Sequence, residues 1–129
     1  MIKTGILNPQ INSLISRVRH TNTLVIADRG FPFWPEIETV DISLVDDVPT
    51  VVEVLQALRS NFVFGRAWMA REFLKSNDAR TRSRFAAGLH GIAVKYEPHV
   101  QFKLRLPRAI GLIRTGDTIQ YANIVLESA

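Results

Sequence analysis

Apolar residues follow a helical spacing near the amino end of the chain. After Asn8 and Pro9 they recur three and four positions apart, at Ile11, Leu14, Ile15 and Val18. Proline is common at the first position of a helix, directly after a capping asparagine. The segment 9–19 therefore predicts an amphipathic helix.

The next apolar run, TLVIA at 23–27, has no polar alternation and is rich in β-branched residues. Such a run is typical of a strand that is buried on both faces of a parallel sheet. It ends at Asp28. Two prolines and a glycine within residues 29–35 then predict an irregular loop.

Strand and helix signals alternate along the rest of the chain. Further strands are predicted at 39–45, 62–70, 92–96, 109–114 and 123–127. Further helices are predicted after Asp47 and Pro49, at 76–89 with Ser76 or Asn77 as the cap, and at 99–106 before Pro107. This alternation favours an α/β fold with a mostly parallel central sheet flanked by helices.

Composition suits one domain over residues 1–129. Of these residues, 47% are hydrophobic and 22% charged, which is enough to bury a core. Cysteine is absent, so disulfides, thiolate zinc sites and a cysteine nucleophile are excluded. No segment approaches the ~20 apolar residues that span a bilayer, and no signal peptide is visible. We therefore expect a soluble, cytoplasmic protein without membrane partners.

A positive net charge raises nucleic acid as a partner. The formal charge is +4, and Arg80, Arg82 and Arg84 lie close together in the sequence. On a helix Arg80 and Arg84 share a face while Arg82 points away, which favours a solvated surface over a phosphate track. We expect no nucleic-acid partner and keep a basic nucleic-acid-binding module as the weakest of three functional hypotheses. A salt-dependent affinity for nucleic acid would support it.

Several motifs of nucleotide-binding proteins and hydrolases are absent. The chain has no G-x-x-x-x-G-K-S/T loop, no G-x-G-x-x-G after the first strand and no G-x-S-x-G motif. The histidines, His20, His90 and His99, are dispersed, which does not favour a metal site.

Polar residues do stand at the ends of predicted elements. Asp28 follows the first strand, and open α/β sheets bind ligands at the carboxyl ends of their strands. His20 closes the first helix. Taken singly, Asp28 also suits a turn and His20 a helix carboxyl end.

Three stretches of the chain carry a resemblance to one family. Residues 5–32, GILNPQINSLISRVRHTNTLVIADRGFP, resemble the opening of the D-ribose pyranase and fucose mutarotase family. HVQFK at 99–103 is similar to the family's histidine followed by phenylalanine and lysine. IRTGDTIQYANIVL at 113–126 is similar to the family's RTGE and YANC or YGNI ending. Residues 36–90 match in layout more than in letters.

The resemblance implies an isomerase that acts on a free monosaccharide in the cytoplasm, without cofactor or metal. It places His20 at the position of the catalytic acid or base. The positions that contact the sugar correspond to Asp28, His99, Lys103, Tyr121, Ala122 and Asn123. Family members form rings, which implies a homo-oligomer, a decamer of two stacked pentamers.

These residue types suit the opening of a sugar ring. Interconversion of anomers or ring sizes needs a proton removed from the anomeric hydroxyl and another given to the ring oxygen. Histidine suits this task, because its unperturbed pKa of ~6.5 leaves both protonation states available near neutrality. Aspartate, tyrosine, asparagine and lysine supply hydrogen bonds to the sugar hydroxyls.

The spacing of His20 and Asp28 adds a constraint. An extended strand at ~3.3 Å per residue separates them by roughly 20 Å, so they cannot flank one small sugar within a single chain. We therefore predict that the pocket is completed across a subunit interface, or that only one of the two contacts the reacting carbons.

Two arginines depart from the family pattern. Arg19 stands where glycine is common, and Arg29 where alanine is usual. An arginine in the pocket would favour an acidic or phosphorylated sugar; we instead expect both to face solvent or an intersubunit carboxylate. The aromatic loop residues Phe31, Phe33 and Trp34 suit either sugar stacking or burial at an oligomer interface.

A noncatalytic sugar-binding or transport-accessory protein with the same pocket is the alternative hypothesis. In such a protein, His20→Ala leaves sugar binding intact, and neither version accelerates exchange between sugar forms.

Overall fold

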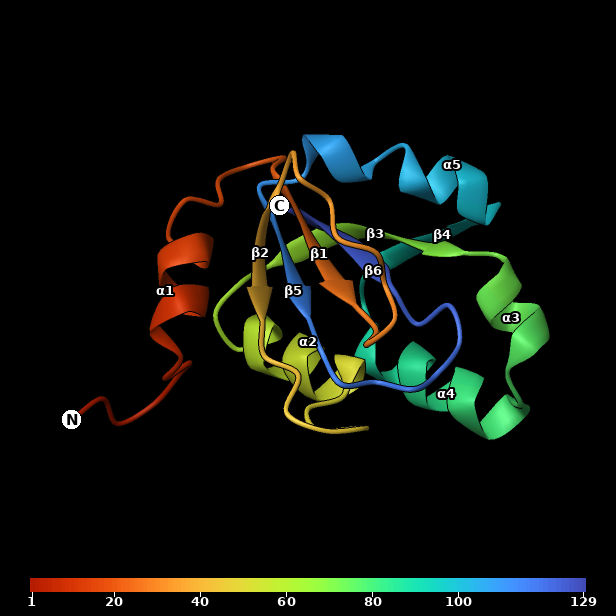
Figure 1. The fold of residues 1–129 in the computed structure, drawn as a ribbon, viewed down its shortest axis with the longest axis horizontal. Helices are drawn as coiled ribbons and strands as arrows, with labels where there is room; N and C mark the ends of the chain where they lie inside the picture. Colours follow the sequence, from red (N-terminus) through yellow and green to blue (C-terminus); the bar gives the residue numbers. More distant parts are fainter.

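Six strands form one mixed sheet in the order β2-β5-β1-β6-β3-β4 in the computed structural model, which describes residues 1–129 (Figure 1). The strands are β1 Thr23–Ala27, β2 Glu38–Asp41, β3 Phe64–Ala70, β4 Ala93–Glu97, β5 Gly111–Arg114 and β6 Ile124–Ser128. Neighbours run parallel except at β6, which is antiparallel to both β1 and β3. The predicted α/β fold with a mostly parallel sheet is therefore confirmed.

Helices cover both faces of the sheet. They are α1 Pro9–Ile15, α2 Val51–Arg59, α3 Glu72–Ser76, α4 Ala79–Gly88, α5 His99–Lys103 and the 3₁₀ helix η1 Leu106–Arg108. Helices α1 to α4 pack around a core of 22 buried residues on one face. On the other face, α5, η1 and the loop between β1 and β2 cover a smaller core of 10 buried residues. None of the helices is long and apolar enough to cross a lipid bilayer.

The central strand β1 contributes to both cores. Leu24 and Ile26 point into the larger core, whereas Val25 and Ala27 point into the smaller one. This division follows from the strand geometry, in which successive side chains face opposite sides. All of them are at most 1% exposed, so β1 is buried on both faces, as its unbroken apolar run predicts.

Helix α1 is shorter than the apolar spacing predicts. It ends at Ile15 instead of continuing to residue 19. The N–H groups of Arg17 and Val18 bond back only three residues, to Leu14 and Ile15, so the chain tightens into a 3₁₀-like turn. Val18 is nevertheless only 4% exposed, and its burial explains why it continues the apolar spacing.

The helix predicted at 76–89 corresponds to α4, which begins only at Ala79 and is separated by a break from the short helix α3 before it. The backbone of Asn77 is extended, with φ −124° and ψ 151°. The cap of α4 is Asp78, whose carboxylate accepts the Thr81 N–H at 2.8 Å. The prediction of Ser76 or Asn77 as the cap is therefore wrong, because the side chain that accepts the free N–H groups decides where the helix begins.

The segment between β2 and α2 is a loop where the sequence predicts the end of a strand and the start of a helix. Strand β2 ends at Asp41 and not at residue 45. Helix α2 begins after Thr50, which forms a capping box with Glu53. Asp47 does not open this helix; its carboxylate accepts hydrogen bonds from the backbone and hydroxyl of Thr118.

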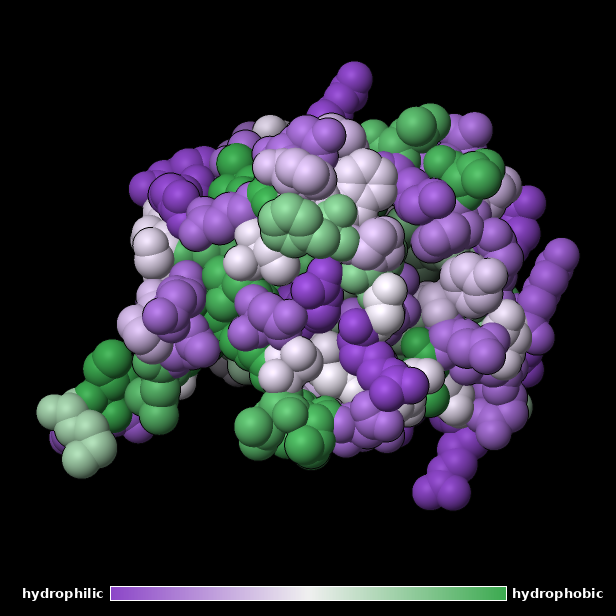
Figure 2. Space-filling model, viewed as in Figure 1, coloured by the Kyte–Doolittle hydropathy of each residue, from purple (hydrophilic) through white to green (hydrophobic).

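The first residues of the chain project from the body of the molecule. They extend to the left in Figure 1, and Figure 2 shows apolar side chains in this projection. Met1, Ile2 and Leu7 are all exposed. A second group of exposed apolar residues lies in the loop before α2 and consists of Leu44, Val45 and Val48. Apolar surface therefore remains outside the two cores.

Candidate active site

A cleft of about 460 Å³ lies at the carboxyl end of β1. Its lining residues are Asp28, Gly30, Phe31, Pro32, His99, Gln120, Tyr121 and Asn123. Because β6 runs antiparallel to β1, the residues just before β6 lie beside the residues just after β1. The first residue of α5, His99, completes the group. The cleft thus brings together Asp28, His99, Tyr121 and Asn123, which are distant in the sequence.

Asp28 is held by its own loop and by Asn123. Its backbone N–H donates to Asn123 Oδ1 at 2.8 Å, and its Oδ1 accepts the Gly30 N–H at 3.0 Å. Burial raises the pKa of Asp28, although the hydrogen bonds from Gly30 and Asn123 oppose the shift. The carboxylate is therefore less well solvated than an ordinary aspartate and has an acceptor oxygen to offer to a ligand.

His99 is fixed at the start of α5. Its backbone N–H lies 3.1 Å from both carboxylate oxygens of Glu72. The ring meets the ring of Tyr121 edge-on, with centroids 5.2 Å apart and planes at 77°. Burial lowers the pKa of His99, and the Lys103 cation lowers it further, while Glu72 and Asp28 act in the opposite direction.

The His99 imidazole has hydrogen-bonding capacity left over. Nδ1 is buried and has no hydrogen-bond partner among the protein groups. Since the lowered pKa favours the neutral ring, one ring nitrogen can accept and the other can donate. A ligand hydroxyl in the cleft can use such a group.

Tyr121 and Asn123 enter the site from the segment before β6. Asn123 is 4% exposed, and its amide oxygen is committed to Asp28. Tyr121 is half-buried and has a left-handed backbone, with φ +56°. For a residue other than glycine this conformation costs about 1–3 kcal/mol, so the surrounding structure must hold it.

Lys103 and Ala122 stand beside the cleft and do not form its wall. Lys103 follows His99 by one turn of α5, close enough for its charge to affect the imidazole. Ala122 is fully buried between Tyr121 and Asn123.

The residues RTGD at 114–117 support the cleft from behind. The Arg114 guanidinium contacts Asp41 at 3.1 Å and donates to the Phe31 carbonyl at 2.9 Å, which holds the loop after β1. Asp117 is 1% exposed and accepts the N–H of Val51, the first residue of α2, at 2.8 Å. These charged groups therefore position the site and do not line it.

Gly116 is required by close packing. A Cβ atom at this position would collide with the backbone carbonyls of Val45 and Val48. Any side chain here would push the 114–117 segment away from the loop before α2.

His20 lies at the opposite end of β1 from Asp28. It is exposed in a turn in which the Asn22 N–H donates to the Arg19 carbonyl at 3.0 Å. The next residue, Thr21, has a left-handed backbone (φ +66°), and its N–H donates to the Ser128 carbonyl at 2.9 Å. Within one chain, the structure does not bring His20 into the cleft with the other predicted residues.

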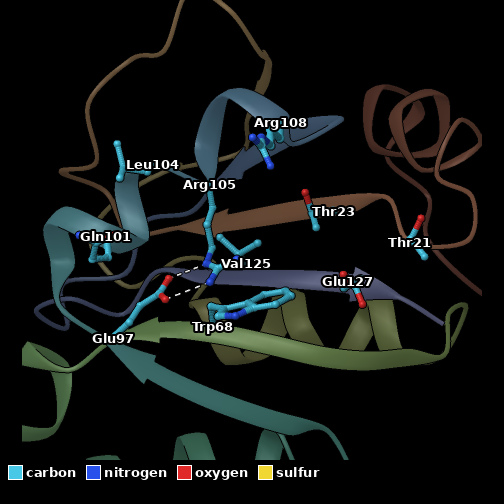
Figure 3. A pocket seen from close by; sticks show the side chains of 10 residues that line it. All are labelled: Thr21, Thr23, Trp68, Glu97, Gln101, Leu104, Arg105, Arg108, Val125 and Glu127. Atoms are coloured by element: carbon cyan, nitrogen blue, oxygen red, sulfur yellow. Dashed lines mark hydrogen bonds and ion pairs between the residues drawn. The ribbon is translucent and has the colours of Figure 1, made fainter.

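A second cleft, of about 470 Å³, opens beside this turn (Figure 3). Thr21, Thr23 and Glu127 lie along one side of it, and residues of α5 and η1 along the other. In its middle, Arg105 forms two contacts with Glu97, at 2.5 and 3.0 Å, and lies 4.3 Å from the Trp68 ring centroid. Because these charges and the indole face are already paired, the second cleft is a weaker candidate for ligand chemistry than the first.

Arg19 and Arg29 do not enter the first cleft. Arg29 pairs with Asp46 at 2.6 Å, and both side chains are exposed. Arg19 folds back onto the carbonyls of Ser16 and Val18. Both arrangements agree with the expected orientation toward solvent.

The aromatic loop residues differ in their environments. Phe31 is buried and packs edge-on against Phe102, with ring centroids 6.5 Å apart. Trp34 is partly buried against the smaller core, whereas Phe33 is 67% exposed. Only Phe31 belongs to the cleft wall.

The arginine row on α4 is partly engaged within the chain. Arg82 donates to the Leu74 carbonyl at 3.0 Å, and the Arg84 guanidinium lies 5.8 Å from the Phe85 ring centroid. No group of three or more histidine or acidic side chains is arranged to hold a metal ion.

Some residues of the site escaped the sequence analysis. The cleft is also lined by Gly30, Pro32 and Gln120. Gly30 and Pro32 lie within the stretch 5–32, and Gln120 lies within the stretch 113–126. The resemblance of these two stretches to the family was the only sequence signal for the three residues. Glu72 orients His99 from a different helix. No sequence pattern marks it, because the contact exists only after α3 and α5 are placed.

Known proteins match this chain over nearly its whole length. The model of the RbsD / FucU transport protein family matches residues 1–129. A D-ribose pyranase of Geobacillus kaustophilus is 38% identical over 99% of this chain and 93% of its own length. A D-ribose pyranase of Chromobacterium violaceum is 37% identical over 99% of this chain and 97% of its own length.

Solved structures extend the comparison to the fold. Bacillus subtilis RbsD, complexed with D-ribose, superimposes with a TM-score of 0.92 at 29% identity, over 100% of this chain and 98% of that one. The fucose mutarotase of Streptococcus pneumoniae, in complex with L-fucose, shares the fold, with a TM-score of 0.79 at 18% identity over 99% and 98% of the two chains. The full-length matches in sequence and structure show that this chain belongs to the RbsD / FucU transport protein family.

Proposed function

We propose that this protein is an isomerase that interconverts the ring forms of a free monosaccharide, with D-ribose as its leading substrate, without a cofactor. The observation that carries the proposal is the cleft in which Asp28, His99, Tyr121 and Asn123 converge. Related proteins over 30% identical are named D-ribose pyranase, and a structural neighbour holds D-ribose. These names favour catalysis over the alternative of a noncatalytic sugar-binding protein.

The proposed reaction opens and recloses the sugar ring. A base removes the proton of the anomeric hydroxyl, the bond between the anomeric carbon and the ring oxygen breaks, and an acid protonates that oxygen. The carbonyl form then recloses on another hydroxyl or from the other face. His20 acts as the acid or base, while Asp28, His99 and Tyr121 hydrogen bond to the hydroxyls.

The proposed site uses two copies of the chain. His20 and Asp28 lie at opposite ends of β1, so a second copy supplies His20 to the cleft of the first. The exposure of the His20 turn supports this arrangement. We further propose that the copies form a closed ring assembly, a decamer, and that the protein acts in the cytoplasm on free sugars.

Exchange measured by saturation-transfer NMR tests the function. With D-ribose, the wild type should accelerate exchange between ring forms. His20→Ala should lower the acceleration by about 10²-fold or more while ribose still binds. His90→Ala is the matched control, because His90 is also exposed but lies outside the cleft.

The outcomes separate the hypotheses. If wild type and His20→Ala bind ribose equally and neither accelerates exchange, the protein is a binding protein and the proposal is wrong. A panel of fucose, rhamnose and uronic acids identifies the substrate. The pairing of Arg29 with Asp46 predicts no preference for the acidic sugars.

A further inference from the structure

Asn77 lies outside the cleft, in the break between α3 and α4, and uses both hydrogens of its side-chain amide. Nδ2 donates to the Phe73 carbonyl at 2.9 Å and to the Gln120 carbonyl at 2.9 Å. Both partners are acceptors, which settles the orientation of the amide. The flipped group would turn its oxygen toward two other oxygens.

The second of these bonds acts on the backbone of a cleft residue. The Gln120 carbonyl belongs to the peptide group that precedes Tyr121, and φ of Tyr121 is the rotation next to that peptide. No other side chain hydrogen bonds to the backbone of Gln120 or Tyr121. Tyr121, with its left-handed φ of +56°, therefore follows a peptide group whose carbonyl is held by Asn77.

The neighbouring residues are anchored separately. The Ile119 N–H donates to Asp117 at 2.8 Å, and Asn123 is joined to the backbone of Asp28 at 2.8 Å. Between these anchors, the segment 120–122 carries Tyr121, whose ring makes the edge-on contact with the His99 ring. Asn77 holds the middle of this short span.

We infer that Asn77 is a positioning residue for the sugar site, acting through the Gln120 carbonyl to hold Tyr121 against His99. The effect on sugar recognition rests on the proposed function, whereas the effect on the contact between the two rings does not. Loss of the Asn77 amide frees the Gln120 peptide to rotate, so the Tyr121 hydroxyl leaves the position from which it meets the sugar.

Asn61 provides a matched control. Its Nδ2 donates to the Ala57 carbonyl four residues earlier, at 3.0 Å, just as that of Asn77 does to Phe73. Asn61 follows the end of α2 in the sequence and has no second carbonyl partner. Replacing Asn61 therefore removes the same helix-end hydrogen bond without touching the cleft.

The kinetic test compares Asn77→Ala and Asn77→Asp with Asn61→Ala and Asn61→Asp in ribose exchange. Both Asn77 variants should raise KM about tenfold with kcat within about twofold, because a hydrogen bond to the sugar is weakened in the bound and transition states alike. Asp should do at least as much harm as Ala, since a carboxylate would face two carbonyl oxygens. The Asn61 variants should keep both constants within about twofold of the wild type.

A structural readout keeps the inference testable without activity. In deuterated protein with ¹³C-labelled histidine and tyrosine, the wild type should show a nuclear Overhauser effect between the His99 and Tyr121 rings. Loss of this signal in the Asn77 variants alone supports the inference. Its persistence in Asn77→Ala, or equal loss in the Asn61 variants, overturns it.

The two readouts also separate this inference from the proposed function. A wild type without exchange activity refutes the function, while the ring contact still decides the role of Asn77. A lost ring contact with an unchanged KM would overturn the inferred effect on sugar recognition.

Discussion

Two ionisable side chains in the cleft have pKa values shifted in opposite directions. Burial raises the pKa of Asp28 and lowers that of His99, because each charged form loses hydration. Both shifts favour neutral groups. A neutral imidazole can donate and accept at once, which suits the recognition of sugar hydroxyls.

Replacing Asp28 should stabilise the fold at neutral pH. A raised folded-state pKa stabilises the native state fully below the unfolded pKa, and this stabilisation is lost as pH rises through the folded pKa. At pH 7 the partly buried carboxylate is therefore unfavourable, and Asp28→Asn should raise the free energy of unfolding. Asn can still accept the Gly30 N–H.

Urea unfolding at pH 7 and pH 3.5, at one protein concentration, measures this difference. The gain in unfolding free energy should vanish at the lower pH, where the wild-type carboxyl is protonated. At pH 7, Asp28→Asn should bind ribose more weakly than the wild type. A loss of stability at pH 7 would show that the carboxylate is favourably solvated in the cleft.

The titration of His99 should respond to its two charged neighbours with opposite signs. Lys103→Met removes a cation and should raise the pKa of His99, while Glu72→Gln removes an anion and should lower it. Gln retains an oxygen that can accept the His99 N–H. NMR of the imidazole resonances measures both shifts; movement of both in one direction would contradict the assigned causes.

At the scale of elements, the segment between β5 and β6 joins the cleft to α2. Asp117 accepts the N–H groups of Val51 and Ile119, both at 2.8 Å, and so caps the helix and shapes the loop that leads to Tyr121. The negative charge of a carboxylate at the amino end of a helix also interacts favourably with the helix dipole. The cleft therefore depends on the docking of α2.

Asp117→Ala should destabilise the protein by about 2 kcal/mol, because the buried Val51 N–H and the partly buried Ile119 N–H lose their acceptor. Chemical denaturation measures the loss, and ribose exchange should fall with it. Thr118→Val is the control: Thr118 is exposed, and its hydroxyl bonds to Asp47 at the surface. An effect of Asp117→Ala no larger than that of Thr118→Val would contradict this role.

At the scale of the whole molecule, strand β1 separates the proposed acid or base from the proposed sugar cleft. His20 precedes the strand and Asp28 follows it. Two copies arranged in a ring can bring these ends together, since a closed assembly presents one surface of each subunit to a different surface of the next.

Mixed oligomers should recover activity that each parent lacks. Subunits carrying His20→Ala and subunits carrying Asp28→Asn, coexpressed in equal amounts, should form sites of which about a quarter have both native side chains by random pairing. Exchange NMR on the mixed assembly should therefore show about a quarter of the wild-type rate per site. Light scattering establishes the stoichiometry. Mixed oligomers as inactive as the parents would contradict a site built from His20 of one copy and Asp28 of another.

Local features of the fold were predictable from short stretches of sequence. The buried strand β1 follows from its apolar run, and the loop after Asp28 follows from its prolines and glycine. Helix boundaries were less predictable: the cap at Asp78 depends on which of several neighbouring polar side chains accepts an N–H.

The sequence by itself determined the class of fold and the polar residues at the ends of its elements, because apolar periodicity, caps and turns act over a few residues. Only the tertiary structure decided which of those residues meet. Strand β6 inserts antiparallel between β1 and β3, which places Tyr121 and Asn123 beside Asp28. The contact of Glu72 with His99 depends instead on the placement of α3 and α5 after the paired strands β3 and β4. Pairing between distant strands depends on the packing of the whole sheet, and no local pattern encodes it.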